Sequence, residues 1–166
     1  CSSDLFDISL LYEAFGMDII IIETVGVGQA EFEIYNLVYS TIVILIPGAG
    51  DAIQMQKAGI IEIGDIYDVN KKDLGGEEVV VQIEMMLDDA TSSQSGWRPP
   101  AHMTNSLSGE GVDELIESIW EHKDYIKMSG LIEEKKKQRY AYKVKDAIMN
   151  KIESILLHKF GIDHTI

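Results

Sequence analysis

Short apolar runs alternate along this chain with longer segments of helical periodicity, and this alternation constrains the fold more than any other feature. The apolar runs cover residues 17–23, 41–46, 66–69 and 101–104. Between them, apolar residues recur at a spacing of three or four, which is typical of amphipathic helices. Strands that alternate with helices indicate βα units on a parallel sheet. The sequence therefore predicts an α/β fold in which helices flank a parallel sheet.

The boundaries of these elements follow from glycine, proline and capping residues. The continuous apolar runs at 17–23 and 41–46 predict two buried strands. Helices are expected over residues 29–39, 51–61, 77–89, 112–126 and 131–160. The last helix is long and charged, and it carries an apolar stripe that needs a partner surface. The stripe consists of Tyr140, Val144, Ala147, Ile148, Ile152, Ile155 and Leu156.

Composition excludes several classes of partner. The chain has 14 basic and 28 acidic residues, and its formal net charge of −14 would repel nucleic acid and anionic membrane surfaces. No apolar run approaches the roughly 20 residues that a membrane-spanning helix needs. The single cysteine, Cys1, rules out an internal disulfide and fits a reducing compartment. We therefore expect a cytoplasmic protein that binds neither nucleic acid nor a membrane.

A motif that reads guanine follows the predicted strand at 66–69. Residues Asn70, Lys71 and Asp73 form an Asn-Lys-x-Asp pattern. In such a motif the aspartate carboxylate accepts hydrogen bonds from N1–H and the exocyclic amine of guanine, and adenine lacks this donor pattern. Downstream, Ser106 and Leu107 lie in a loop that leads into a helix, where backbone N–H groups would approach the base O6. The joint pattern predicts a guanine nucleotide site.

A second polar loop follows the apolar run at 17–22. Glu23 ends the run, and the residues that follow are Val25, Gly26, Val27, Gly28 and Gln29. A carboxylate at the end of a buried strand is costly unless it is paired or bound to a metal, and the glycines would let the backbone approach a phosphate. This pattern predicts a Mg²⁺ site at Glu23 beside the γ-phosphate. The glycine-rich segment 47–57 is consistent both with a site loop and with a simple strand-to-helix connection, and its residues alone do not decide between the two.

The phosphate-binding loop of GTPases, G-x-x-x-x-G-K-[ST], does not occur in these 166 residues. We therefore expect the chain to be the C-terminal portion of a GTPase domain, and to be inactive in GTP hydrolysis by itself. The alternative is a non-catalytic pseudo-GTPase that serves as an interaction or dimerisation module. A phosphate-binding loop in the sequence upstream of Cys1 would exclude that alternative.

Taken together, the stretches 23–31, 47–73 and 97–115 resemble the MeaB/ArgK family, whose older label is LAO/AO transport kinase. The family consists of P-loop GTPases of the SIMIBI class that chaperone adenosylcobalamin-dependent methylmalonyl-CoA mutase. The resemblance implies that Glu23 lies near Mg²⁺ and that Asn70, Lys71 and Asp73 read guanine, with the backbone of Ser106 and Leu107 contacting the base. It also implies two switch segments, formed by Val25, Gly26, Val27, Gly28 and Gln29 and by Asp51, Gln54 and Lys57.

The resemblance further implies how such a protein works. GTP or GDP and Mg²⁺ would bind, and hydrolysis would gate loading and protection of the mutase. The C-terminal helix would form a homodimer, so residues 1–128 would belong to the GTPase domain and residues 129–166 to a helical dimerisation extension. The phosphate-loop strand of the family lies between the strands matching 17–23 and 41–46, and without it two apolar edges would be left unpaired.

Two departures from the family pattern stand out. Asn105, Ser106 and Leu107 replace the usual Ser-Ala-Leu, which preserves an N–H contact but changes the local turn. Asp68 lies inside a predicted strand where relatives carry a valine-like residue. A buried, unpaired carboxylate there would cost several kcal/mol, so Asp68 is expected to be paired, exposed or the mark of a degraded sequence.

Overall fold

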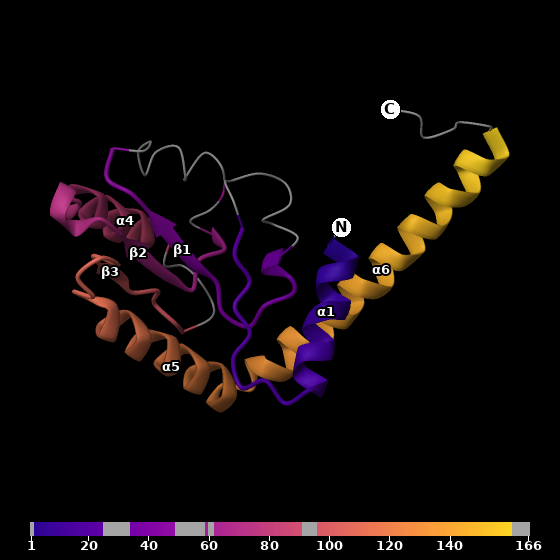
Figure 1. The fold of residues 1–166 in the computed structure, drawn as a ribbon, viewed down its shortest axis with the longest axis horizontal. Coiled ribbons are helices and arrows are strands. Elements are labelled where there is room, and N and C mark those ends of the chain that lie inside the picture. Colours follow the sequence, from indigo (N-terminus) through magenta and orange to yellow (C-terminus); the bar gives the residue numbers. More distant parts are fainter. Residues whose placement is uncertain (1, 25–33, 49–58, 60–61, 91–95, 161–166) are drawn as a thin grey trace. The chain divides into compact units, whose positions relative to one another are not determined.

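The computed structural model describes residues 2–24, 34–48, 59, 62–90 and 96–160 (Figure 1). The chain divides into two compact units. One unit combines residues 1–37 with residues 133–166, and the other consists of residues 38–132.

The central unit contains a parallel sheet with the strand order β1-β2-β3. Its strands are β1 (Ile42–Leu45), β2 (Ile66–Val69) and β3 (Ala101–Met103). In register, Ile44 of β1 lies opposite Asp68 of β2, and Asp68 lies opposite His102 of β3. Parallel pairing brings the carboxyl ends of all three strands to one edge of the sheet.

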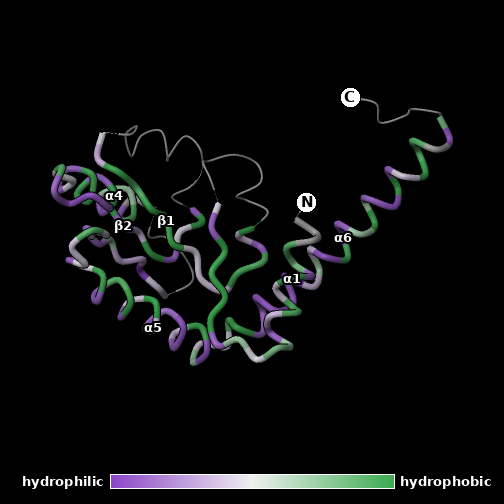
Figure 2. The backbone as a smooth tube through the Cα atoms, viewed as in Figure 1, coloured by the Kyte–Doolittle hydropathy of each residue, from purple (hydrophilic) through white to green (hydrophobic). Residues whose placement is uncertain are grey.

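Helices α4 (Glu77–Ala90) and α5 (Val112–Met128) flank the strands on opposite sides (Figure 1). Tyr67 and Val69 point from β2 toward α4 and form the buried core with Ile83 and Leu87. Because side chains alternate along a strand, Asp68 lies on the other face of β2. Figure 2 shows β1 as a hydrophobic segment, in keeping with its Ile-Val-Ile-Leu sequence.

The amino ends of the strands are tied to α5 by polar groups. The imidazole of His122, on α5, is buried, and its Nδ1 lies 2.7 Å from Ser40 Oγ. Its Nε2 lies 3.3 Å from Asp65 Oδ1. The ring of Trp97 lies against the same imidazole in a tilted arrangement, with centroids 4.9 Å apart, and its Nε1 donates to the Asp65 carbonyl at 2.9 Å. This cluster fixes the strand edge opposite the candidate site.

The other unit pairs α1 (Ser2–Ala14) with most of α6 (Leu131–Phe160). Arg139 Nη2 donates to Glu13 Oε1 at 2.9 Å, and Lys143 Nζ lies 2.9 Å from the Asp7 carboxylate. The ring of Phe6, which is buried, meets Tyr140 edge-on, with centroids 6.2 Å apart. Helix α1 was not among the elements predicted from the sequence.

Several predicted elements are confirmed. The strands at 66–69 and 101–104 form, although β3 ends at Met103. The predicted helices at 77–89 and 112–126 correspond to α4 and α5, and the helix at 131–160 has the predicted bounds. The observed fold is therefore α/β, with a parallel sheet between helices.

The predicted buried strand at 17–23 is wrong. These residues form no strand, and Met17, Ile19 and Ile21 are 56%, 60% and 87% exposed. An apolar run becomes a strand only where a neighbour satisfies its backbone N–H and C=O groups. Within the described residues, β1 is paired only with β2, so the run at 17–23 has no such neighbour.

The strand at 41–46 is present as β1 but is not buried as predicted. Its residues alternate between exposed and half-buried, and Ile44 is 63% exposed. Val43 and Leu45 pack against the core, whereas the opposite face of β1 is uncovered within the described residues. Of the helix predicted at 29–39, only Ile34 and Tyr35 are helical in the described part, and the helix at 51–61 lies almost wholly outside the described residues.

Candidate functional site

The first polar turn at the carboxyl edge of the sheet follows β2. All residues of β2 are buried, and the Asn70 N–H donates to the Leu45 carbonyl at 2.8 Å, which extends the pairing with β1 by one step. Lys71 adopts a left-handed conformation with φ 63° and ψ 48°, which is uncommon for a residue other than glycine. A short 3-10 turn over Lys72–Leu74 follows. This backbone places Asn70 and Asp73 on the same turn.

The second loop follows β3 and is organised by the side chain of Asn105. Its Oδ1 accepts from the N–H groups of Leu107 at 3.0 Å and Ser108 at 3.3 Å. The Asn105 N–H donates to the Glu110 carbonyl at 2.8 Å, which closes the loop. Gly111, with φ 78°, immediately precedes α5 and lies directly beside the Met103 carbonyl, where a Cβ would clash with backbone.

Direct hydrogen bonds join these two loops. Asn70 Oδ1 accepts from the Ser106 N–H at 3.2 Å, and Asn70 Nδ2 lies 3.3 Å from Ser106 Oγ. Asn105 Nδ2 donates to Asp73 Oδ1 at 3.0 Å. The structure thus brings together Asn70, Asp73 and Ser106, three predicted site residues separated by up to 36 positions in the sequence.

Charge strengthens the junction at its exposed rim. Lys72 Nζ donates to Glu110 Oε1 at 2.5 Å, so the turn after β2 and the loop after β3 are also joined by an ion pair. The hydrogen bond and the charge of Glu110 raise the pKa of Lys72. Both side chains are exposed, and such pairs contribute little to stability. Their effect here is to limit how far the two loops separate.

The predicted backbone contacts of this loop are engaged within the protein. The Ser106 N–H is bonded to Asn70 and the Leu107 N–H to Asn105, whereas the Leu107 side chain is 96% exposed. Lys71 contributes its left-handed backbone and an N–H that donates to Asn70 Oδ1 at 2.6 Å. Sequence reasoning missed Asn105 and Glu110 as members of the site, although the departure at Asn105 marked the position.

Asp68 is buried and paired on one side only. It is 3% exposed, and Thr104 Oγ1 donates to its Oδ2 at 2.8 Å, whereas Oδ1 has no hydrogen-bond partner among the described residues. Burial raises the pKa of Asp68, and the Thr104 hydrogen bond and the charge of His102 oppose that rise. Asp68 was expected to be paired, exposed or the mark of a degraded sequence, and the structure shows it paired with Thr104.

The predicted metal and switch residues are less fully described. Glu23 is exposed rather than buried, so the burial argument for a metal there does not hold. Mg²⁺ is commonly bound by one or two carboxylates together with substrate phosphates, and the exposed Glu23 carboxylate has suitable chemistry for that role. No group of three or more potential metal ligands occurs among the described residues. The predicted switch residues lie outside the described residues: Val25, Gly26, Val27, Gly28, Gln29, Asp51, Gln54 and Lys57.

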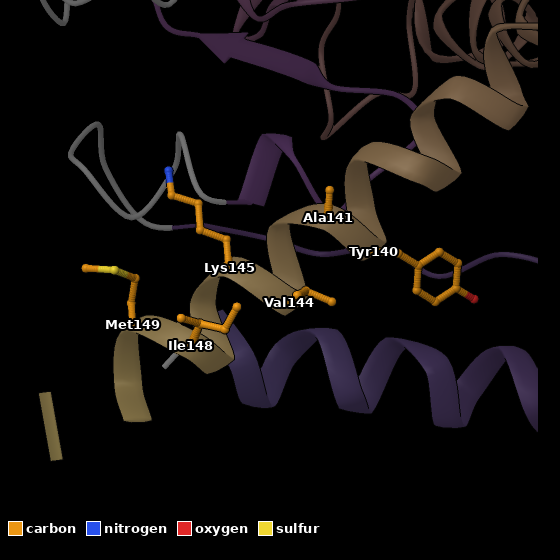
Figure 3. Close-up of a pocket in the computed structure, with 6 residues that line it drawn as sticks. All are labelled: Tyr140, Ala141, Val144, Lys145, Ile148 and Met149. Carbon is orange, nitrogen blue, oxygen red and sulfur yellow. The ribbon is translucent and has the colours of Figure 1, made fainter. Parts of the chain in front are cut away.

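A separate apolar surface runs along α6. A hollow of about 470 Å³ is lined by Tyr140, Ala141, Val144, Lys145, Ile148 and Met149 (Figure 3). Val144, Ile148 and Ile152 are 59%, 54% and 45% exposed. The predicted stripe is therefore uncovered within the described part of the chain. No helix in that part is long and apolar enough to cross a membrane.

The chain is similar to a known protein family and to several named proteins. A family model described as methylmalonyl Co-A mutase-associated GTPase MeaB matches residues 2–160. A Pyrococcus horikoshii protein named as a candidate GTPase is 39% identical over 141 residues, which cover 83% of this chain and 44% of that protein. The Escherichia coli GTPase ArgK is 32% identical over 137 residues, covering 80% of this chain and 41% of ArgK.

Two further similarities extend the comparison. The mouse mitochondrial protein named methylmalonic aciduria type A homolog is 34% identical over 137 residues, covering 79% of this chain and 32% of that protein. A crystal structure of an LAO/AO transport system kinase superposes with a TM-score of 0.71 at 27% identity, covering 98% of this chain and 52% of that one. The chain spans less than half the length of these curated relatives.

Proposed function

Because this chain belongs to the MeaB family of methylmalonyl-CoA mutase-associated GTPases, we propose that it supplies the guanine-reading part of a GTP-hydrolysing chaperone. In this proposal, GTP binding and hydrolysis gate adenosylcobalamin loading and protection of methylmalonyl-CoA mutase. The observation that carries the proposal is the hydrogen-bonded junction between the Asn70–Asp73 turn and the Asn105–Gly111 loop.

Base recognition rests on the Asp73 carboxylate. It would accept hydrogen bonds from N1–H and the 2-amino group of guanine, while adenine offers neither donor in that position. Asn105 Nδ2 donates to Asp73 Oδ1, and Asn70 Oδ1 accepts from the Ser106 N–H. These contacts fix the carboxylate before the base arrives, which reduces the ordering cost of binding. The Ser106 and Leu107 amides lie in the loop that would border the base O6.

Mg²⁺ and the phosphates are assigned to other parts of the protein. We assign Glu23 as a carboxylate beside Mg²⁺, and Val25–Gln29 together with Asp51, Gln54 and Lys57 as switch residues. When bound, Mg²⁺ would neutralise charge on the phosphates. The client mutase would favour the ordered switch state and so accelerate hydrolysis, which is a population shift.

The remaining parts of the proposal concern assembly and location. The uncovered stripe of α6 is assigned to a homodimer interface, with residues 129–166 as the dimerisation extension and residues 1–128 as the GTPase part. A cytoplasmic location also belongs to the proposal, since the single cysteine suits a reducing compartment. The mitochondrial location in the mouse relative's name applies to that protein.

Replacing Asp73 with asparagine tests the proposal. The Asp73→Asn amide would donate to the 2-oxo group of xanthine, so the preference should change from GDP to xanthosine diphosphate (XDP). We expect the ratio of the two affinities to change by at least about tenfold, because one altered hydrogen-bonding group is worth roughly 1.4 kcal/mol or more. Calorimetry with GDP, XDP and ADP in the presence of Mg²⁺ measures this change. The unmodified chain, which lacks the phosphate-binding loop, should bind GDP weakly, leave ADP unbound and show no turnover by itself.

The matched control is Asp124→Asn, which makes the same chemical change on the exposed surface of α5. It should leave the preference for GDP unaltered. Equal binding of GDP and ADP by the unmodified chain, or binding of neither, would contradict the proposed function.

A further inference from the structure

A buried polar pair lies directly beneath the two joined loops. Thr104 and Asp68 are 2% and 3% exposed, and the Thr104 hydroxyl donates to Asp68 Oδ2 at 2.8 Å. The other residues of β2, including Tyr67 and Val69, are fully buried and apolar. A carboxylate at this position therefore stands out from its strand, and none of the base-reading contacts described above uses it.

Thr104 is the residue at which the two loops meet. Its N–H donates to the Val69 carbonyl at 3.0 Å, which is the last rung between β2 and β3. Its carbonyl accepts from the Lys72 N–H at 3.0 Å, in the middle of the turn that carries Asp73. Asn105, the next residue, holds the Asp73 carboxylate. A displacement of Thr104 would therefore move both loops.

Stability alone does not account for a carboxylate here. Replacing a buried polar pair by apolar side chains of similar shape is often neutral or stabilising. The hydrogen bond from Thr104 to Asp68 holds the Thr104 side chain in one rotamer. It thereby holds the end of β3 that carries the Asn105–Gly111 loop. In register with Asp68 lie Ile44 on β1 and His102 on β3, and His102 Nε2 lies 2.8 Å from Ser118 Oγ on α5.

We propose that Asp68 and Thr104 are a positioning pair for guanine recognition, acting through the Thr104 backbone on Lys72 and through Asn105 on Asp73. The inference rests on the proposed function, since it requires that Asp73 reads the base. Neither residue touches the nucleotide. The pair affects how well the Asp73 carboxylate is aligned with the base. Loss of the pair should therefore weaken the preference for bases that carry the 2-amino group of guanine.

Thr104→Val removes the hydroxyl and keeps the shape of the side chain. By misaligning Asp73 it should lower GDP affinity about tenfold, the size expected when one hydrogen bond between the base and this carboxylate is lost. It should also lower the ratio of GDP to IDP affinity, because IDP lacks the 2-amino group. Thr104→Ser retains the hydroxyl and should restore both values to within about twofold of the unmodified chain. Amide hydrogen exchange at Lys72 should accelerate in Thr104→Val only.

A double variant separates positioning from stability. Asp68→Leu combined with Thr104→Val replaces both members by apolar groups of similar shape, so its thermal stability should equal or exceed that of the unmodified chain. Its GDP affinity should nevertheless remain about tenfold lower than that of the unmodified chain. Its ratio of GDP to IDP affinity should remain severalfold lower. The control Ser40→Ala removes another hydroxyl, at the opposite strand edge beside His122, and should leave GDP affinity unchanged.

The outcomes distinguish this inference from the function on which it rests. If the unmodified chain binds no guanine nucleotide, the proposed function fails and the positioning pair fails with it. If the unmodified chain binds GDP and the stable double variant binds GDP with the same affinity and the same ratio to IDP, only the positioning pair is refuted.

Discussion

At the scale of single residues, Asn105 shows what the sequence revealed and what it could not. The Asn-Lys-x-Asp pattern predicted that Asn70 and Asp73 act together, and the structure places both on one turn. That the Asn105 side chain would hold Asp73 and two loop amides was not predictable, because these bonds depend on how two distant loops meet. The departure from the family pattern at Asn105 nevertheless lies at the centre of the junction.

The buried carboxyl group of Asp68 leads to a prediction about how folding stability depends on pH. Burial raises its pKa above the ordinary value of 3.8, so folding disfavours the ionised form. Its contribution to stability is therefore greatest below pH 3.8 and is lost as the pH rises through the folded-state pKa. Asp68→Asn cannot ionise, so its stability relative to the unmodified chain should increase with pH by about 1.4 kcal/mol for each unit of the shift.

Denaturant unfolding of both proteins at a series of pH values from acidic to neutral measures this difference. Asp124→Asn, an exposed aspartate on α5, is the control and should show no comparable trend. A relative stability of Asp68→Asn that falls as the pH rises would contradict the assigned cause.

At the scale of elements, the sequence predicted those whose partners are local. β2, α4 and β3 form one continuous βαβ unit, and both strands and the helix were predicted. The run at 17–23 failed because strand formation depends on a neighbouring strand, which no local pattern reveals. Helix α1 was missed because its cover comes from α6, more than a hundred residues away. Local periodicity therefore predicts elements whose partners are near in the sequence better than elements whose partners are distant.

The junction between the Asn105 loop and α5 makes a prediction at this scale. Gly109 and Gly111 both have positive φ, 82° and 78°, so alanine would be strained at either position by about 1–2 kcal/mol. A Cβ at Gly109 would meet open space, whereas one at Gly111 would collide with the Met103 carbonyl. Gly111→Ala should therefore lower the free energy of unfolding by at least about 1 kcal/mol more than Gly109→Ala. Urea unfolding of the two variants measures the difference, and equal losses would refute the close contact.

At the scale of the whole molecule, the exposed stripe of α6 makes a prediction about assembly. Ile148 lies in the middle of the stripe and is 54% exposed. Ile148→Glu would place a charge in an interface formed by two copies of α6, so it should convert a dimer to a monomer in sedimentation equilibrium. Glu153→Lys also changes a charge on the exposed surface of α6 but lies outside the stripe, and it should leave the dimer intact. A monomeric unmodified chain would contradict the proposed interface.

The length of α6 has a further consequence. Among the described residues, Arg139 and Lys143 of α6 form hydrogen bonds and ion pairs with α1, and the helix continues well beyond them to Phe160. Helices of about 15 residues are marginal in water unless something covers them. The distal turns of α6 should therefore be helical only to the extent that two copies associate. Dilution should unwind them, so that the ellipticity at 222 nm and the resistance of this segment to proteases both depend on protein concentration.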